Sequence, residues 1–425
     1  YPIPAFLTPQ DGPEHEIVSC NEILNNEPYG SPGAQYTDLA YAGIRLNSGV
    51  EWSSFSELSA YFKEGVTVLK APFDVDSPFE PTNLLPEIAY DLLTNTKYGV
   101  GEVVGAGQVD ANEMEEATKF CNANRLFWDG VIGERVNIRE WIYENAGYCL
   151  LQFRIKGGRF SLYPDVPFDS AGLIAKTQKI SPKVLFTDGN MKDLQVSFLS
   201  PEERQLFKAT VLWRQETTNG FPQTRTVTVR LSSGEQGGSD NDPEETFDMA
   251  GFCTSQEHAE TFAKYALKTR QLVDHGIKFQ TTPQMAMGLE PGEYFQVASA
   301  VTHSDTNLGS RLNNGSIDGE GNVIGLSIDN GTYDVQYWKP GTSGLNTDRL
   351  QVANGKTSSS TLRNSIFAVS RQNNPQTRVY KLESLTYAED GLVEVAGSVA
   401  PLTEGGLLAT LDWGDNDDHF EVGAA

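Results

Sequence analysis

The sequence predicts a mainly β protein with α+β insertions: several small β-barrel or sandwich domains and one short helical α/β domain. Short apolar stretches bounded by turn residues recur along the chain, and 40 glycines and 21 prolines supply many turns. Helical spacing of apolar residues is confined to a few segments. With 425 residues, the chain is long enough for two to four domains, because single hydrophobic cores stop growing near ~250–300 residues.

The N-terminal part of the chain is predicted to form an arm followed by β-strands. Residues 1–35 are rich in Pro, Asn and Gly and show no period, so we expect an N-terminal arm there. Residues 36–85 are expected to form a β segment of a first barrel, with strands over 38–46 and 65–70. Because the chain starts at Tyr1, we expect it to be a segment of a longer polypeptide.

Residues 86–190 predict an α/β domain. Pro86 suits the first turn of one helix, and Asp110 and Asn137 are candidate N-caps of two more. Gly157 and Gly158 lie between two apolar runs, which indicates a β-hairpin.

Residues 191–302 predict a β domain with one long helix, over 255–272. Thr254 to Glu257 fits a capping box, and Ala259, Ala263 and Leu267 lie on one helical stripe. Residues 303–402 show only strand and turn patterns, and we expect a small C-terminal β domain there. Residues 403–425 carry six acidic residues and no Lys or Arg, so we expect an acidic linker or tail.

The charge balance argues against two kinds of partner. Lys and Arg number 32 and Asp and Glu 57, so the net charge is 32 − 57 = −25. Docking on nucleic-acid phosphates or on an anionic lipid surface needs a basic patch. The apolar runs are also far shorter than the ~20 residues of a membrane span.

The sequence predicts no catalytic, cofactor-binding or metal-binding residues. The four cysteines are scattered without a C-x-x-C pair, so we expect buried thiols rather than disulfides or a zinc site (Cys20, Cys121, Cys149 and Cys253). Gly99, Gly101 and Gly105 resemble a dinucleotide fingerprint, but the third glycine is one residue late and the motif follows a predicted helix rather than a strand. We therefore expect a loop there.

Two alternative functions remain open on the residues alone. A virion-associated or secreted multi-domain β glycan hydrolase would use two facing carboxylates, and 57 acidic residues offer many pairs. A glycan-binding protein would use exposed aromatic side chains such as Trp52, Trp338 and Trp413.

Four motifs follow one another along roughly residues 36–402. They are Leu92–Gly101 with the helix start Val109-Asp110, Phe252–Ala259 with Leu267–Thr269, Leu289–Glu293 with Val297, and Arg378–Leu382 with Glu389–Gly391. In this order they resemble the central region of the lambda-like phage tail tip protein family (tip attachment, or host specificity, protein J). Departures from the family pattern include Glu293 where Asp is usual and Phe252 where Gly is commoner.

The resemblance implies a structural virion protein and no enzyme: the central hub of a siphophage tail tip, at the distal end of the tail. It implies a homotrimeric ring of small β domains that closes the tail tube, serves as the conduit for DNA ejection and links the tail to host-recognition parts. The implied partners are other tail-tip and distal tail proteins, the tail tube and the tape measure protein. Phage DNA would pass without specific binding, and assembly would take place in the bacterial host cytoplasm.

Overall fold

In the computed structural model, all the elements described below belong to one compact unit, residues 65–425. Strand predominates over helix, which confirms the predicted mainly β class. The predicted arm lies outside the described residues, as does most of the β segment 36–85 except β1 (Thr67–Leu69) and β2 (Phe79–Pro81). The described residues are 67–69, 79–133, 135–216, 222–234, 236–299, 308–311, 330–353, 365–370, 378–388 and 391–424.

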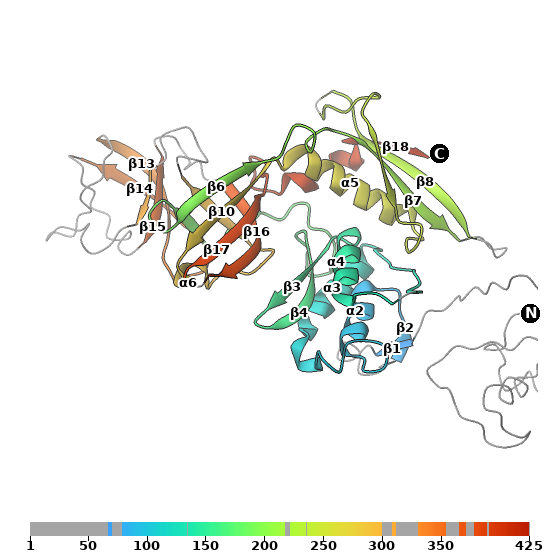
Figure 1. Ribbon diagram of the computed structural model, residues 1–425. Helices are drawn as coiled ribbons and strands as arrows, with labels where there is room; N and C mark the ends of the chain where they lie inside the picture. The colour runs from blue at the N-terminus through green and yellow to red at the C-terminus, as the bar shows by residue number, and fades with distance from the viewer. Residues whose placement is uncertain are drawn as a thin grey trace, which may run out of the picture. The chain divides into compact units, whose positions relative to one another are not determined.

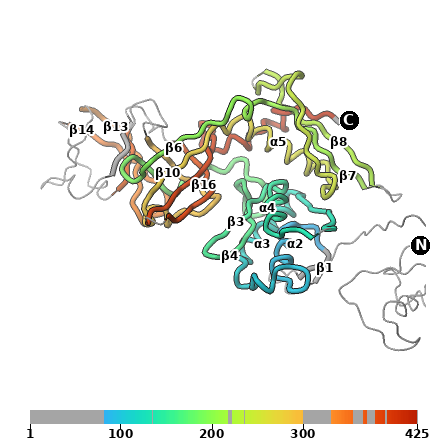
Figure 2. The backbone as a smooth tube through the Cα atoms, viewed as in Figure 1, coloured from blue at the N-terminus to red at the C-terminus, as the bar shows by residue number. Residues whose placement is uncertain are grey.

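Helices and a hairpin form the first part of the described chain (Figure 2). Pro86 lies in the first turn of its helix and the Asp110 side chain accepts the N–H of Glu113, so both predicted starts are confirmed. Gly157 and Gly158 form the predicted turn, with φ of +54° and +80°. The elements are α2 (Leu85–Thr94), η3 (Ala106–Gln108), α3 (Ala111–Ala123), α4 (Ile138–Tyr148), β3 (Leu151–Lys156) and β4 (Arg159–Pro164).

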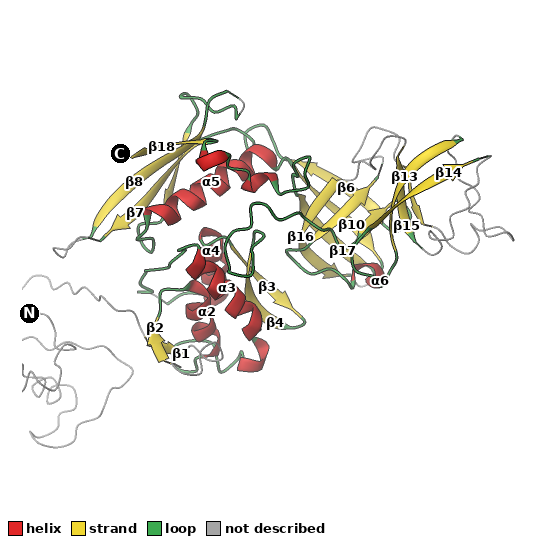
Figure 3. Ribbon diagram, turned by 180° about the vertical axis from the view of Figure 1, so that it is seen from behind, coloured by secondary structure: helices red, strands yellow, loops and turns green. Residues whose placement is uncertain are grey.

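A curled six-stranded sheet, in the order β5-β11-β16-β17-β10-β6, forms the second part (Figure 3). Alternate residues of β10 are buried. The rings of Phe186, Phe279 and Phe295 contact one another in the hydrophobic core of this sheet. The sheet pairs strands from the predicted segments 86–190, 191–302 and 303–402. Its elements are β5 (Leu185–Thr187), β6 (Lys192–Phe198), β10 (His275–Thr281), α6 (Pro283–Ala286), β11 (Tyr294–Ala298), β16 (Arg378–Tyr387) and β17 (Val393–Val399).

A second, four-stranded sheet, in the order β18-β8-β7-β9, has α5 packed on it (Figure 1). The strands β7, β8 and β9 lie between β6 and β10 in the chain, and β18 is supplied by the C-terminal segment. The long helix predicted over 255–272 is confirmed, and Ala259, Ala263 and Leu267 are buried. The predicted capping box is wrong by one residue, because the N-cap is Ser255, which accepts the N–H of His258, and not Thr254. The elements are β7 (Lys208–Gln215), β8 (Gln223–Leu231), β9 (Glu244–Asp248), α5 (Gln256–Leu272) and β18 (Phe420–Ala424).

Between β11 and β16 the chain forms a third sheet, in the order β12-β15-β13-β14. Its own small core includes Tyr333, Val335, Leu350 and Phe367. The strands are β12 (Leu308–Arg311), β13 (Gly331–Trp338), β14 (Asn346–Val352) and β15 (Ile366–Ser370).

Residues 403–424 differ from the expected acidic linker. They contain the 3-10 turns η6 (Ala409–Leu411) and η7 (Asp415–Asp417), and β18 pairs with β8. Leu411, Trp413 and Phe420 are buried in the same core as α5, which explains why this segment folds in spite of its charge. Asp417 pairs with Lys176 and Lys264, so part of the acidity is neutralised internally.

Candidate assembly site: internal joints and an open cavity

The first family-like motif, Leu92–Gly101, is the end of α2 and the turn that follows. The N–H of Val100 donates to the Leu92 carbonyl, and the N–H of Gly101 donates to that of Asn95, both at 2.9 Å. A Cβ on Gly101 would lie 2.0 Å from the Thr94 carbonyl oxygen, so only glycine fits. These contacts show that the glycine-rich segment is a turn that ends α2. This agrees with the expectation that the segment is a loop and not a dinucleotide-binding motif.

Asp129 joins the entrance of α2 to the second motif. Its carboxylate accepts hydrogen bonds from Asn83 Nδ2 at 3.0 Å and from Thr254 Oγ1 at 2.5 Å. Its backbone carbonyl accepts from Arg214 Nη2 at 2.5 Å, and its N–H donates to the carbonyl of Phe252. The Asp129 carboxylate thus joins the residues before α2 to the residues before α5, and the Asp129 backbone adds contacts to Arg214 in β7 and to Phe252.

A cluster of thiols lies where α3, α4 and α5 meet. Cys121, Cys149, Cys253 and His258 are all fully buried. The thiol of Cys121 is the largest influence that lowers the pKa of Cys149 from 9.0 to about 6, and His258 acts in the same direction against burial. Burial alone lowers the pKa of His258, but the thiols of Cys149 and Cys253 outweigh it and raise the pKa from 6.5 to about 10. His258 Nε2 also lies 2.8 Å from the Tyr148 carbonyl oxygen. The cluster therefore connects α5 to the end of α4 through polar contacts inside an apolar core.

The third motif, Leu289–Glu293, borders a charged cleft of about 810 Å³. Arg154 in β3 donates through Nε and Nη2 to Glu113 in α3, at 3.0 and 2.6 Å, and through Nη1 to the Pro291 carbonyl at 2.8 Å. Lys156 bridges Glu113 and Glu290 at 3.1 and 2.8 Å. The motif's turn is therefore bound by the helical part of the chain through charged hydrogen bonds, which are roughly twice as strong as neutral ones.

The network sets the ionisation of Glu113. Burial acts to raise the pKa of this carboxyl, but the charged hydrogen bonds from Arg154 and Lys156 outweigh it and hold the pKa below its usual value. Glu113 is therefore a fixed anion, held by cations on both sides. Such pairing makes it a poor candidate for the general acid of a glycan hydrolase, which needs a raised pKa.

An open apolar cavity of about 730 Å³ lies between α4, the residues before β7, β9 and α5. Two exposed carboxylates, Glu144 and Glu203, border it, whereas the Arg270 guanidinium at the same border is paired with Glu245 at 3.0 Å. Its walls include six apolar or aromatic residues, Tyr148, Phe207, Phe247, Phe262, Tyr265 and Ala266.

The aromatic residues proposed for glycan binding are not presented to solvent. Trp338 is 3% exposed and donates its indole N–H to the Thr342 carbonyl; Trp413 is 6% exposed and donates to that of Thr410. Trp52 lies outside the described residues. The prediction that Trp338 and Trp413 are exposed is therefore wrong.

Within the described ranges, no group of three or more His, Cys, Asp and Glu side chains is arranged to hold a metal ion. The same ranges contain no helix with the length and apolar character needed to span a membrane. The structural roles of Asp129, Arg154 and the cluster around His258 were not predicted from the sequence; for the cluster, the C-x4-H spacing of Cys253 and His258 was a usable signal.

No family model matches the chain, and no curated protein matches it. Among solved structures, it is similar to the tail protein from Neisseria meningitidis MC58, with 8% identity, a TM-score of 0.28 and coverage of 66% of this chain and 59% of that one. It is similar to a chain of the virion of the native gene transfer agent particle, with 10% identity, a TM-score of 0.32 and coverage of 79% and 62%. It is also similar to the prophage MuSo2 43 kDa tail protein from Shewanella oneidensis, with 10% identity, a TM-score of 0.27 and coverage of 63% and 56%. The chain thus spans less than two thirds of the length of each of these chains.

Proposed function

We propose that the chain is a structural virion protein, the central hub of a siphophage tail tip, and not an enzyme. The observation that carries this proposal is that the motifs resembling the tail tip family make structural contacts between helices and strands. The motifs end α2, receive Asp129 at the start of α5, and place the 289–293 turn against Arg154. Residues that connect sheets and helices suit a structural role in the wall of a ring, whereas residues of an active site would converge on one pocket.

In this proposal three copies form a ring that closes the tail tube at its distal end, links the tail to host-recognition parts and acts as the conduit for DNA. The ring would contact other tail-tip and distal tail proteins, the tail tube and the tape measure protein. Three chains carry 3 × (−25) = −75 charges. An acidic lumen would repel phosphates, so DNA would pass without specific binding. Assembly would take place in the cytoplasm of the bacterial host.

The test is electron microscopy of the virus particle labelled with an antibody against this chain. The expected result is label at the distal end of the tail only. Label on the capsid, along the tail shaft or absent from intact particles would contradict the proposal. A parallel mass measurement of the purified chain in solution tests the trimer separately.

A further inference from the structure

One side of α5 lines the open apolar cavity along much of the helix. These lining residues are half-buried and follow one another at helical spacing, so they form a continuous stripe about 16 Å long. Ala259, Ala263 and Leu267, on the other side of α5, are buried in the core. The name α5 groove is used below for the cavity. Its lining stripe consists of Phe262, Tyr265, Ala266, Thr269, Arg270 and Val273.

Aromatic rings supply much of the remaining lining of the α5 groove. The ring centroids of Phe247 and Phe262 are 5.3 Å apart, and those of Tyr148 and Phe262 are 5.1 Å apart. All three rings keep part of their surface exposed. Contiguous exposed apolar surface marks interaction sites. The volume of about 730 Å³ also lies in the range of ~300–1,000 Å³ typical of sites that enclose a ligand.

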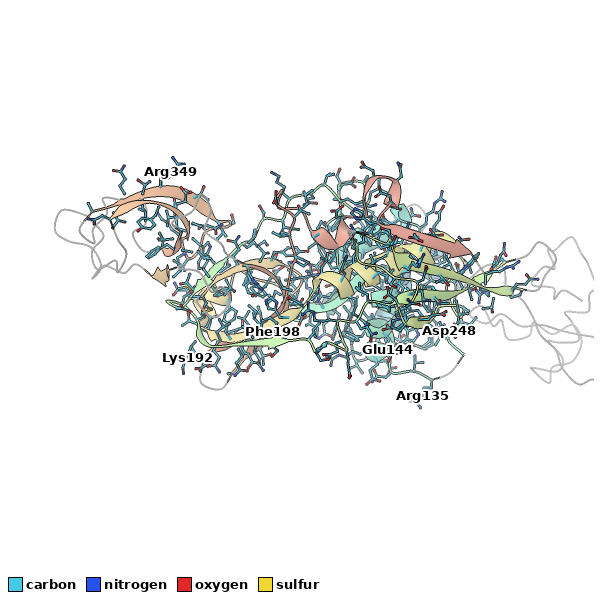
Figure 4. The ribbon with its side chains drawn as sticks, turned by 90° about the horizontal axis from the view of Figure 1, so that it is seen from above. Arg135, Glu144, Lys192, Phe198, Asp248 and Arg349 are labelled. Atoms are coloured by element: carbon cyan, nitrogen blue, oxygen red, sulfur yellow. The ribbon has the colours of Figure 1, made fainter. Side chains whose placement is uncertain are left out.

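The border of the α5 groove is acidic. Glu144 (labelled in Figure 4) and Glu203 are exposed, and neither forms an ion pair with a residue that the structure describes. The N–H of Ser200 donates to Glu203 at 2.7 Å and lowers the pKa of this carboxyl, so it stays charged. Arg270, the cation among the lining residues, acts on Glu203 less than Ser200 does and is itself paired with Glu245 at 3.0 Å.

The charges around the α5 groove favour a basic partner over a second copy of the chain. Exposed charges beside the groove cancel in pairs, Glu202 with Arg204 and Glu140 with Arg139, so the two carboxylates of the border leave it negative. A second copy has 57 acidic and 32 basic residues and would bring mostly like charge. A partner whose basic side chains flank an apolar stripe complements both the border and the walls.

We propose that the α5 groove binds an amphipathic helix of a different, basic protein. The apolar side chains of that helix, at positions i, i+3, i+4 and i+7, lie along the α5 stripe against Phe247 and Phe262. Its Lys or Arg side chains pair with Glu144 and Glu203. A groove about 16 Å long holds roughly three turns of such a helix. The inference deepens the proposed function, on which it rests for the presence of a neighbouring protein.

The first experiment measures the binding of two stapled helical peptides to the purified full chain by fluorescence anisotropy. Both peptides have about four turns and carry leucine on one face. The other face carries lysine in the first peptide and glutamate in the second. We expect the lysine peptide to bind at least about tenfold more tightly. Equal affinities, or no binding of the lysine peptide, would overturn the proposal.

Variants of the chain locate the site. Glu144→Lys and Glu203→Lys, made separately, are each expected to weaken binding of the lysine peptide about threefold or more. Ala266→Trp fills the groove from its wall and is expected to weaken binding about tenfold or more. The matched controls are Glu102→Lys and Ala171→Trp, at exposed positions outside the groove, and they should leave the affinity within about twofold. Unchanged binding by Glu144→Lys and Ala266→Trp overturns the proposal, and the exposed position of Glu144 keeps the test valid if Ala266→Trp does not fold.

Other results identify a different occupant. Self-association of the wild-type chain that Ala266→Trp abolishes would assign the α5 groove to a second copy and overturn the proposal. Binding of 2-phenylethylammonium as tight as that of the lysine peptide would assign it to a small amine, with the same consequence. Antibody label at the distal end of the tail without peptide binding overturns the groove proposal alone. Peptide binding with label elsewhere on the particle contradicts the hub and leaves the groove proposal standing.

Discussion

Arg154 and Glu113 form a two-point ion pair in which Nε and Nη2 of the guanidinium lie 3.0 and 2.6 Å from the two carboxylate oxygens. The side chains are only 5% and 10% exposed. The third donor of Arg154 reaches the Pro291 carbonyl, so one arginine connects α3, β3 and the turn before β11. The planar fork of a guanidinium supplies this geometry and an ammonium does not.

Breaking this pair is expected to be costly. Glu113→Gln leaves the Arg154 charge buried without an anion, and such changes cost about 3–5 kcal/mol. The measurement is the free energy of urea unfolding at pH 7. Glu115→Gln on the same helix is the matched control, because its pair with Lys119 is largely exposed and is worth at most about 1 kcal/mol. Equal losses for the two variants would contradict the role of the buried pair.

The same pair gives a pH dependence of defined sign. The pKa of Glu113 is lower in the folded protein than its ordinary value of 4.5, since its hydrogen bonds outweigh burial. A carboxyl with a lowered pKa stabilises the fold above its unfolded pKa, and this contribution is lost as the pH falls through the folded value. We expect the unfolding free energy of the wild type to fall below about pH 4.5 more steeply than that of Glu113→Gln. Parallel pH profiles would show that Glu113 contributes nothing to acid unfolding.

Substitutions in the turn after α2 test the interpretation that the first motif is a structural turn. Gly101→Ala would place a Cβ 2.0 Å from the backbone oxygen of Thr94, whereas nothing lies within 4 Å of a Cβ on Gly105. We expect Gly101→Ala to destabilise the protein by about 2 kcal/mol or more, in the upper part of the usual range for single substitutions. Gly105→Ala should change stability by less than about 0.5 kcal/mol. Thermal melting of both variants measures the difference.

Local features of the fold were predictable from the sequence, and distant pairings were not. Asp110 caps a helix that starts one residue later, and Gly157-Gly158 turns a hairpin, because these signals involve neighbours in the chain. Arg154 is 41 residues from Glu113 and 137 from Pro291, and no periodicity encodes such a contact. For the same reason the sequence did not predict the sheet in which β18 joins β7, β8 and β9, or the sheet inserted between β11 and β16.

The C-terminal segment shows how composition can mislead. Six acidic residues indicated a solvated tail, but Trp413 is buried beside Phe420, with ring centroids 6.3 Å apart, and Lys176 lies 4.0 Å from the Trp413 ring centroid. Trp413→Ala is therefore expected to cost about 3–5 kcal/mol of unfolding free energy, as large aromatic deletions in a core do. Glu404→Ala, an exposed change in the same segment, should cost less than about 0.5 kcal/mol. Urea denaturation of the two variants distinguishes a folded segment from a linker, because in a linker both substitutions would have the same negligible effect.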